Sequence, residues 1–125
     1  MLTALSIRDV VLIDRLDLAF GAGLTVLTGE TGAGKSILLD SLGMALGARV
    51  EAGLLRPGAD QATVTAGFSP PEGHPAHDLL RERGLSAEDG VVLRRVLGKD
   101  GRSRAFVNDQ PVGVALLRRI GALLT

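Results

Sequence analysis

The sequence predicts an α/β fold that begins with antiparallel strands and contains a second β-hairpin further along. Its centre is predicted by three consecutive features. Residues 24–28 (LTVLT) form a short apolar run suited to a buried strand. The glycine-rich stretch Gly29–Ser36 (GETGAGKS) follows at once, and apolar residues then recur at helical spacing at Leu38, Leu42, Ala45 and Leu46. Strand, glycine-rich loop and helix in this order are the setting in which a phosphate-binding loop occurs.

The stretch Gly29–Ser36 fits the pattern G-x-x-x-x-G-K-[ST], and each fixed position has a chemical reason. Glycines let the backbone curl so that successive N–H groups point at phosphate oxygens. Lys35 adds a positive charge, and the Ser36 hydroxyl can ligate the magnesium that bridges the phosphates. We therefore expect ATP and Mg²⁺ to bind here, with the nucleotide held by Gly29, Glu30, Thr31, Gly32, Ala33, Gly34, Lys35 and Ser36.

Length and composition narrow the possible functions. A chain of 125 residues suffices for one compact domain but is short for a complete P-loop ATPase, which also needs an acidic strand and a group that orients water. Lys and Arg number 14 and Asp and Glu number 14, so any nucleic-acid contact must be a local patch. Cysteine is absent, which excludes disulfides and thiolate metal sites. We see neither a signal peptide nor a run long enough to span a membrane.

Two alternating stretches before the loop predict a leading β-hairpin. Leu5 and Ile7 alternate with polar neighbours, and so do Leu16, Leu18 and Phe20, with a connection near residues 10–14. Leading strands of this kind are typical of ATPase heads of the ABC type, where they approach the nucleotide base. The alternative is that this hairpin only covers an edge of the sheet.

After the loop, Gly47 is expected to end the helix, and Pro57-Gly58 marks a turn in the following segment. Residues 61–68 alternate as a half-buried strand, residues 69–75 form a proline-rich turn, and residues 78–83 form a short helix that Gly84 ends. His74 and His77 lie in or beside the proline-rich turn without clustered carboxylates. We interpret them as solvated loop histidines rather than metal ligands.

A second hairpin is predicted from strand-like residues 91–97 and 104–107, which flank a polar turn containing Asp100-Gly101. It carries five cations, opposed within it only by Asp100: Arg94, Arg95, Lys99, Arg102 and Arg104. This is the one local patch that could contact DNA phosphates, and an ordinary solvated hairpin is the equal alternative. Asn108-Asp109 makes a further turn, and residues 116–124 form an amphipathic helix.

With these features placed, the sequence resembles the N-terminal part of the RecN family of bacterial DNA repair ATPases, relatives of the structural maintenance of chromosomes (SMC) proteins. The resemblance covers almost all of the chain. It is most specific in residues 23–49 (GLTVLTGETGAGKSILLDSLGMALGAR) and residues 93–112 (LRRVLGKDGRSRAFVNDQPV). Glu30-Thr31 favours RecN over RecF-type relatives, because other phosphate loops of the SMC group commonly have Asn at position 31.

The resemblance implies that residues 1–125 are a partial ATPase head of the ABC type, the N-terminal lobe only. The remainder of the head and a long coiled coil would lie elsewhere, so this chain is expected to bind ATP without hydrolysing it. In the family, two heads form a homodimer around two ATP molecules and act on DNA at double-strand breaks. The family also implies a cytoplasmic, nucleoid-associated location. Arg56 lies roughly where related heads place an arginine beside the phosphates, and its alternative role is a solvated loop arginine.

Three other interpretations remain open from the residues. They are a nucleotide-binding fragment of a RecF-type recombination protein, a fragment of a small-molecule P-loop kinase, and an interaction module that binds nucleotide only to keep its shape. The leading hairpin and the basic hairpin favour the DNA repair ATPase. A kinase would be expected to show an acceptor site and a lid, and we can assign neither.

Overall fold

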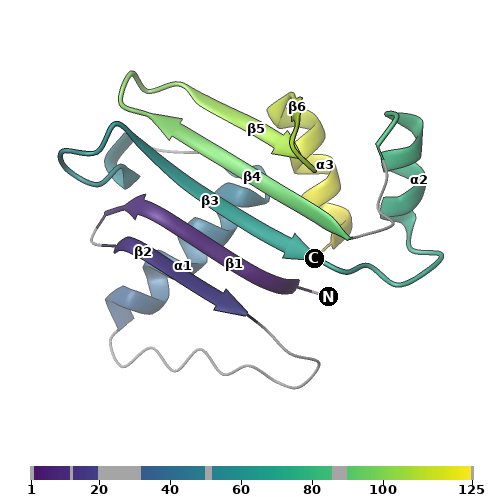
Figure 1. Cartoon of the computed structure of the whole chain (residues 1–125), viewed down its shortest axis with the longest axis horizontal. Coiled ribbons are helices and arrows are strands. Elements are labelled where there is room, and N and C mark those ends of the chain that lie inside the picture. The colour runs from purple at the N-terminus through teal and green to yellow at the C-terminus, as the bar shows by residue number, and fades with distance from the viewer. Residues whose placement is uncertain (1, 12, 20–31, 50–51, 86–89, 125) are drawn as a thin grey trace.

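The computed structural model describes residues 2–11, 13–19, 32–49, 52–85 and 90–124. The six described strands form one antiparallel sheet in the order β2-β1-β3-β4-β5-β6 (Figure 1). The strands are β1 Leu2–Val10, β2 Ile13–Ala19, β3 Gln61–Phe68, β4 Val91–Gly98, β5 Ser103–Val107 and β6 Gln110–Val112. The helices are α1 Gly32–Ala45, α2 Pro75–Glu82 and α3 Val114–Leu124, with a 3₁₀ turn at Ala52–Leu54.

One face of the sheet is apolar because every second residue of its central strands is buried. In β3 the buried positions are Ala62, Val64, Ala66 and Phe68, and in β4 they include Val91, Leu93 and Leu97. A strand turns successive side chains to opposite faces, so this period-two pattern directs one set into the core. The prediction of a half-buried strand at residues 61–68 is confirmed.

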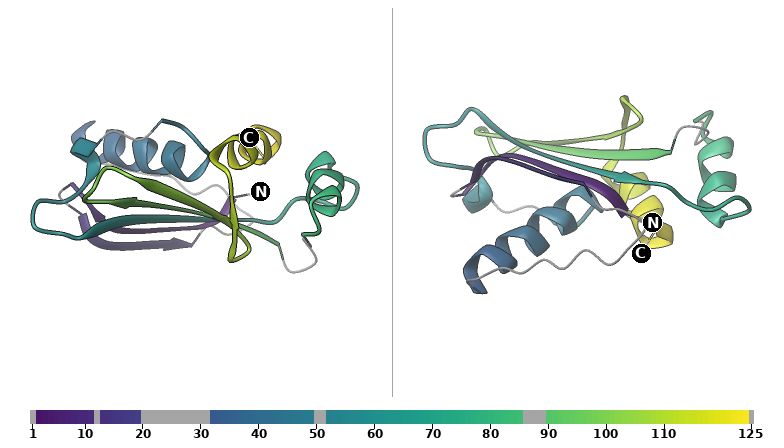
Figure 2. Two further views of the ribbon diagram at one scale, coloured as in Figure 1. Left: turned by 90° about the horizontal axis from the view of Figure 1, so that it is seen from above. Right: turned by 60° about the horizontal axis from the view of Figure 1, so that its bottom comes forward.

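Helices α1 and α3 cover this apolar face, while α2 lies beyond the end of the sheet (Figure 2). Buried Met44 and Ala45 from α1 and Leu117, Ile120 and Leu124 from α3 join the core. Burial of such aliphatic side chains contributes about 25 cal/mol per Å² of apolar surface, which makes this layer the main source of stability. The sheet therefore serves as a platform on which α1, the helix after the glycine-rich loop, is fixed.

The predicted leading hairpin is confirmed: β1 pairs with β2 from Ala4–Ala19 to Val10–Ile13. Strand β2 lies at the edge of the described sheet, and β1 continues into the sheet by pairing with β3. The strand predicted at residues 24–28 lies outside the described residues. The second predicted hairpin is confirmed as β4 and β5, closed by the bond from the Gly98 amide to the Arg102 carbonyl, 2.8 Å.

The short strand β6 was not predicted from the sequence. Asn108 and Asp109 both have positive φ, 48° and 66°, which is the signature of a two-residue hairpin turn. Val107 accordingly pairs with Gln110 across this turn. The turn prediction at Asn108-Asp109 was thus confirmed, but the chain returns to the sheet for three residues before α3 begins.

The interpretation of the two histidines as solvated loop residues was wrong. His74 is the N-cap of α2, where its Nδ1 accepts a hydrogen bond from the Ala76 amide at 3.0 Å. His77 lies inside α2, and its Nε2 is 3.1 Å from the Pro71 carbonyl oxygen. Both side chains are half-buried. They connect the proline-rich turn to α2, which begins three residues earlier than predicted and ends before Gly84 as expected.

Candidate functional site

The phosphate-binding loop predicted at Gly29–Ser36 falls partly outside the described residues, because Gly29, Glu30 and Thr31 are not described. From Gly32 onward the backbone is helical, so Lys35 and Ser36 belong to the first turns of α1, and their side chains lie outside the described part. The first N–H groups of a helix have no acceptor within it, and the helix end carries a partial positive charge. The backbone at Gly32, Ala33 and Gly34 therefore suits an anion such as a phosphate.

Helix α1 is fixed on the sheet by small and apolar side chains. Met44 and Ala45 are buried, and α1 contacts β1, β3 and β4. Ser41 is also fully buried, and its hydroxyl donates to the Ile37 carbonyl one turn earlier at 2.8 Å. Because this bond satisfies the hydroxyl internally, a polar residue can face the core here.

The C-terminal end of α1 closes on Gly47, as predicted. Gly47 has a φ of +97°, its amide bonds to the Met44 carbonyl at 3.2 Å, and the Ala48 amide bonds to the Gly43 carbonyl at 2.9 Å. This pair of bonds is a Schellman motif, which requires a left-handed residue and so favours glycine. The helix consequently ends at a defined residue with some of its last carbonyls satisfied.

Arg95 supplies further donors to this helix end from inside the core. Its side chain is 3% exposed, and its Nη1 donates to the carbonyls of Met44 at 3.2 Å and Ala48 at 3.0 Å. Its Nη2 donates to the Ser103 hydroxyl at 3.0 Å. Burial and the nearby charge of Arg118 lower the pKa of Arg95, although an arginine in a protein stays protonated. The charge therefore faces the negative end of the α1 dipole.

Helix α3 also approaches the end of α1 closely. A Cβ added to Gly121 would lie 2.5 Å from the Leu46 carbonyl oxygen, so only glycine allows the two backbones to come this near. Arg118, one turn earlier on α3, donates from its Nε to the Gly47 carbonyl at 3.2 Å. The end of α1 is thus held by β4 on one side and by α3 on the other.

The basic hairpin is less basic than its sequence predicts, because acidic residues from other turns neutralise it. Arg94 lies 3.5 Å from Asp109, and Lys99 lies 3.4 Å from Asp60. Arg102 reaches Asp100 at 4.0 Å. Asp100 is the only acidic residue within the hairpin, but Asp60 and Asp109 from neighbouring turns also oppose its cations.

Arg94 and Arg95 project to opposite faces of β4. Arg94 stacks on the Phe106 ring, 4.3 Å from its centroid, on the sheet face away from α1 and α3. Arg95 is buried, so it is not available to DNA and is removed from the set of candidate contacts. Arg104 is exposed and has no ion-pair partner among the residues that the structure describes. The accessible candidates are Arg94, Lys99, Arg102 and Arg104.

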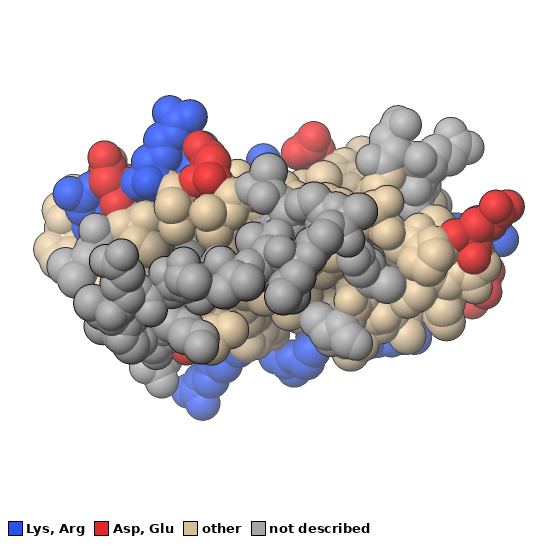
Figure 3. Space-filling view, turned by 90° about the horizontal axis from the view of Figure 1, so that it is seen from below, with Lys and Arg blue, Asp and Glu red and all other residues tan. Residues whose placement is uncertain are grey.

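Basic and acidic side chains also alternate elsewhere on the surface. In Figure 3, blue and red side chains lie side by side along the upper rim of the view, whereas separate blue side chains with little red beside them lie along the lower rim. On the leading hairpin, Arg8 and Arg15 both pair with Asp17, at 2.9 and 3.1 Å. Any contact with a polyanion therefore depends on a few local cations.

Arg56 is held against the leading hairpin. Its Nη1 lies 2.8 Å from Asp14 and 3.7 Å from Asp9, and its amide donates to the Asp9 carbonyl at 2.9 Å. The neighbouring Leu55 forms a bridge with Val10, which joins this segment to the end of β1. Arg56 is thus an ion-paired residue rather than the freely solvated arginine of the alternative interpretation.

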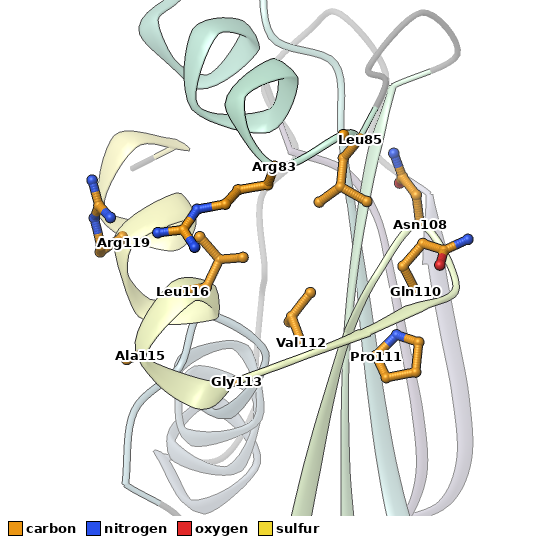
Figure 4. Close-up of a pocket in the computed structure, with 11 residues that line it drawn as sticks. Arg83, Leu85, Asn108, Gln110, Pro111, Val112, Gly113, Ala115, Leu116 and Arg119 are labelled. Atoms are coloured by element: carbon orange, nitrogen blue, oxygen red, sulfur yellow. The ribbon is translucent and has the colours of Figure 1, made fainter.

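A cavity of about 860 Å³ lies apart from α1, between the end of α2, the β5–β6 turn and the start of α3. Figure 4 shows Leu85, Val112 and Leu116 directed into it, with Arg83 reaching in from the end of α2. Its lining includes no residue of α1. This cavity is therefore separate from the end of α1 at which phosphate binding is predicted.

The role of Arg95 is the feature that sequence reasoning missed. The sequence held a signal for it. Arg95 lies on the same strand face as Val91, Leu93 and Leu97, whereas Arg94 lies on the opposite face with Val92 and Val96.

Within the described ranges, no group of three or more His, Asp or Glu side chains is placed to hold a metal ion. None of the described helices is both long and apolar enough to cross a bilayer.

Comparison with known proteins gives matches over nearly the whole chain. A family model described as an AAA domain matches residues 4–96. The DNA repair protein RecN of Haemophilus influenzae is 41% identical over 127 residues, covering 99% of this chain and 23% of RecN. The resemblance to RecN is confirmed, and the chain spans about a quarter of the length of that curated relative.

Two solved structures show the same fold. A structure from work on ATP-driven dimerization and DNA-stimulated activation of SMC ATPases aligns with a TM-score of 0.78 at 24% identity, covering 98% of this chain and 78% of that one. The recombination mediator protein RecF aligns with a TM-score of 0.72 at 13% identity, covering 94% of this chain and 29% of RecF. The predicted fold, an N-terminal lobe of an ABC-type ATPase head, is confirmed.

Proposed function

The chain belongs to the AAA domain family that its residues 4–96 match, and from this premise we propose that it is the ATP-binding lobe of a DNA repair ATPase. One observation carries the proposal. The sequence GETGAGKS leads into α1, a helix whose far end is fixed by buried hydrogen bonds from Arg95 and by close contact with α3. A phosphate-binding helix end works when its N–H groups are held in place before the ligand arrives.

The chain's own residues have distinct tasks in this proposal. Backbone N–H groups of Gly32, Ala33 and Gly34 would bind phosphate oxygens, Lys35 would neutralise the outer phosphates, and Ser36 would ligate Mg²⁺. Bound magnesium would offset phosphate charge and fix the phosphate geometry. This set of amide, ammonium and hydroxyl groups suits magnesium-bound ATP, which is why we propose ATP and Mg²⁺ as the ligands.

We propose that residues 1–125 form a partial head that binds ATP without hydrolysing it alone. Water attack on a phosphate needs a second magnesium ligand and a group that orients the water, and the sequence shows no acidic pair after an apolar strand. Dimerization driven by ATP is a property of the SMC neighbour. By analogy we propose a missing C-terminal half and a head-to-head homodimer as partners.

DNA is the second proposed partner, through phosphates rather than bases. The candidates are Arg94, Lys99, Arg102 and Arg104 on the β4–β5 hairpin, since Arg95 is buried. Phe106 is the one aromatic side chain on these strands, and Arg94 already covers it. Arginines without free aromatic rings favour backbone contacts. We also propose that the protein acts at DNA double-strand breaks, and that it is cytoplasmic and associated with the nucleoid.

We propose a phosphate contact for Arg56 only on the condition that its present ion pairs break. To approach a nucleotide phosphate, its guanidinium must leave Asp14 and Asp9, which hold it at 2.8 and 3.7 Å. Both pairs are partly exposed, so breaking them costs little. A phosphate role for Arg56 would then require a movement of the loop relative to the leading hairpin.

The RecF-type alternative receives less support than RecN. The RecF structure is 13% identical and covers 94% of this chain, whereas the RecN relative is 41% identical and covers 99% of it. A fragment of a small-molecule kinase shares with this chain only the phosphate loop. The leading hairpin instead joins the sheet through β1, and the fold that contains it aligns with the SMC neighbour over 98% of this chain.

Titration of Mg·ATP by calorimetry tests the proposed function. Lys35→Ala should reduce the heat of binding to background, because Lys35 is the only lysine in the loop. Lys99→Ala is the matched control, since Lys99 is the only other lysine, is exposed, and pairs with Asp60 on a distant turn. Equal ATP affinity of the wild type and Lys35→Ala, or loss of binding in Lys99→Ala alone, would refute the proposal.

A further inference from the structure

We propose that Arg95 is a positioning residue for nucleotide phosphates, acting through the far end of α1. The inference rests on the proposed function, because it assumes that the N-terminal end of α1 binds phosphates. It assigns to a buried side chain on β4 the task of fixing where that helix lies on the sheet. Arg95 touches the helix only at its C-terminal end, so it positions the phosphate site and takes no direct part in it.

Apolar packing holds α1 on the sheet, but it sets the position of the helix along its own axis less sharply than hydrogen bonds do. The buried side chains described in α1 are Met44, Ala45 and the small Ser41, whereas Leu39 is 56% exposed. Apolar burial is non-directional, so it favours contact between α1 and the sheet more than it favours one position along the helix axis. Directional contacts must therefore set the position of α1 along its axis.

Arg95 provides these directional contacts. Two hydrogen bonds from one guanidinium nitrogen go to the Met44 and Ala48 carbonyls, on either side of the helix end, and the other nitrogen bonds to Ser103 on β5. The guanidinium is planar and its donors are fixed in direction, so the two strands and the helix end are joined in one geometry. A charged donor at helix carbonyls is also stronger than a neutral one.

The position of α1 at its C-terminal end also determines its position at the N-terminal end, where phosphates are proposed to bind. An α-helix rises about 1.5 Å per residue and behaves as a stiff rod over a few turns. A shift of α1 at Met44 therefore appears at Gly32 as a shift of the same size. Hydrogen bonds to phosphate oxygens weaken steeply when donors move by a few tenths of an ångström beyond about 3.2 Å.

The test uses the whole 125-residue chain with Arg95→Met, which keeps the volume and removes the donors. Mg·ATP affinity should fall about tenfold, the equivalent of one charge-assisted hydrogen bond. Arg95→Lys should lose less, because an ammonium can still donate to one of the two carbonyls. Ser103→Ala should bind ATP like the wild type, since both bonds to α1 remain.

Leu80→Ala controls for a general loss of stability, because Leu80 is fully buried in α2, which packs on α3. Amide hydrogen exchange of the nucleotide-free chain gives a second readout. In Arg95→Met, the amides of residues 37–45 should exchange faster relative to those of β3, whereas Leu80→Ala should accelerate both alike.

The outcomes separate this inference from the proposed function. If the wild type fails to bind ATP, the proposed function fails, and the exchange ratio alone decides the role of Arg95. If the wild type binds and Arg95→Met binds equally well, or loses no more affinity than Leu80→Ala at equal loss of melting temperature, the inference is wrong. An unchanged exchange ratio between α1 and β3 in both Arg95 variants would also overturn it.

Discussion

At the scale of single residues, the effect of each charged side chain depends on the side chains that surround it. Asp17 on β2 accepts hydrogen bonds from Arg8, Ser6 and Arg15, which lower its pKa from 3.8 to about 2, the bond from Arg8 being the strongest cause. The carboxylate lies on the exposed side of the leading hairpin, so its effect on stability is modest. It nevertheless ties β1 to β2 at the sheet edge.

A pH dependence follows from Asp17. Since its folded pKa is below the unfolded value, its stabilising effect is complete above about pH 4 and is lost as the pH falls through 2. Asp17→Asn should therefore lower the free energy of unfolding at pH 6 but not near pH 2. Urea denaturation of both proteins across this range measures it. A difference that stays constant from pH 6 to pH 2 would contradict the assigned pKa.

Arg94 and Arg95 show what the sequence could predict at this scale. Five cations in one hairpin predicted a basic patch, and composition alone could not tell which of them face water. Strand alternation could, because a residue two positions from both Leu93 and Leu97 shares their buried face. The partners Met44 and Ala48 could not be predicted, since they depend on how α1 packs on the sheet.

At the scale of elements, α1 and the β4–β5 hairpin are the two parts of the lobe for which we propose a function. They meet at Arg95 and Ser103, so the proposed nucleotide helix and the proposed DNA hairpin share one buried contact. Most elements were predictable from the sequence, because apolar alternation and glycine stops are local signals. The three-residue strand β6 was missed, since its only signal was the Asn-Asp pair at the turn.

The hairpin's proposed role predicts an effect of charge reversal on DNA binding. Changing Arg102 and Arg104 together to Glu should weaken low-salt DNA affinity by tenfold or more and reduce the slope of log affinity against log salt by about 1 per lost phosphate contact. Fluorescence anisotropy with labelled duplex DNA at several salt concentrations measures both quantities.

The matched control for charge reversal is Arg81→Glu with Arg83→Glu at the end of α2, which changes the net charge equally. Both residues are exposed and lie away from the hairpin. This control should bind DNA nearly as the wild type does. Equal losses in the two double variants would mean that total charge, and not the hairpin, governs DNA binding.

At the scale of the whole molecule, an antiparallel sheet carries α1 and α3 on one face, and the proposed phosphate loop lies at one end of α1. The spacing of the phosphate loop is a local signal in the sequence, and the loop stays a prediction, whereas the anchoring of α1 by β4 and α3 depends on residues 47 to 75 positions apart. The sheet order likewise brings β1 beside β3 across the intervening α1. Such long-range pairings leave no mark in a local pattern.

The last prediction also concerns the whole molecule: the chain binds ATP but does not hydrolyse it. The phosphate loop supplies binding groups and one magnesium ligand, while the water-orienting groups are proposed to belong to a missing half. Binding should therefore leave the γ-phosphate intact. Self-association that completes a site between two copies is the alternative, and it would show as turnover rising with protein concentration.

The most direct measurement is the identity of the nucleotide retained by the chain. The wild type is incubated with Mg·ATP for several hours, bound nucleotide is separated by ultrafiltration and resolved by chromatography, and Lys35→Ala is treated in parallel. The account predicts bound ATP in the wild type, no bound nucleotide in Lys35→Ala, and no more free phosphate than in the variant. Absence of bound nucleotide in the wild type, or ADP and phosphate accumulating well above the Lys35→Ala level, would contradict it.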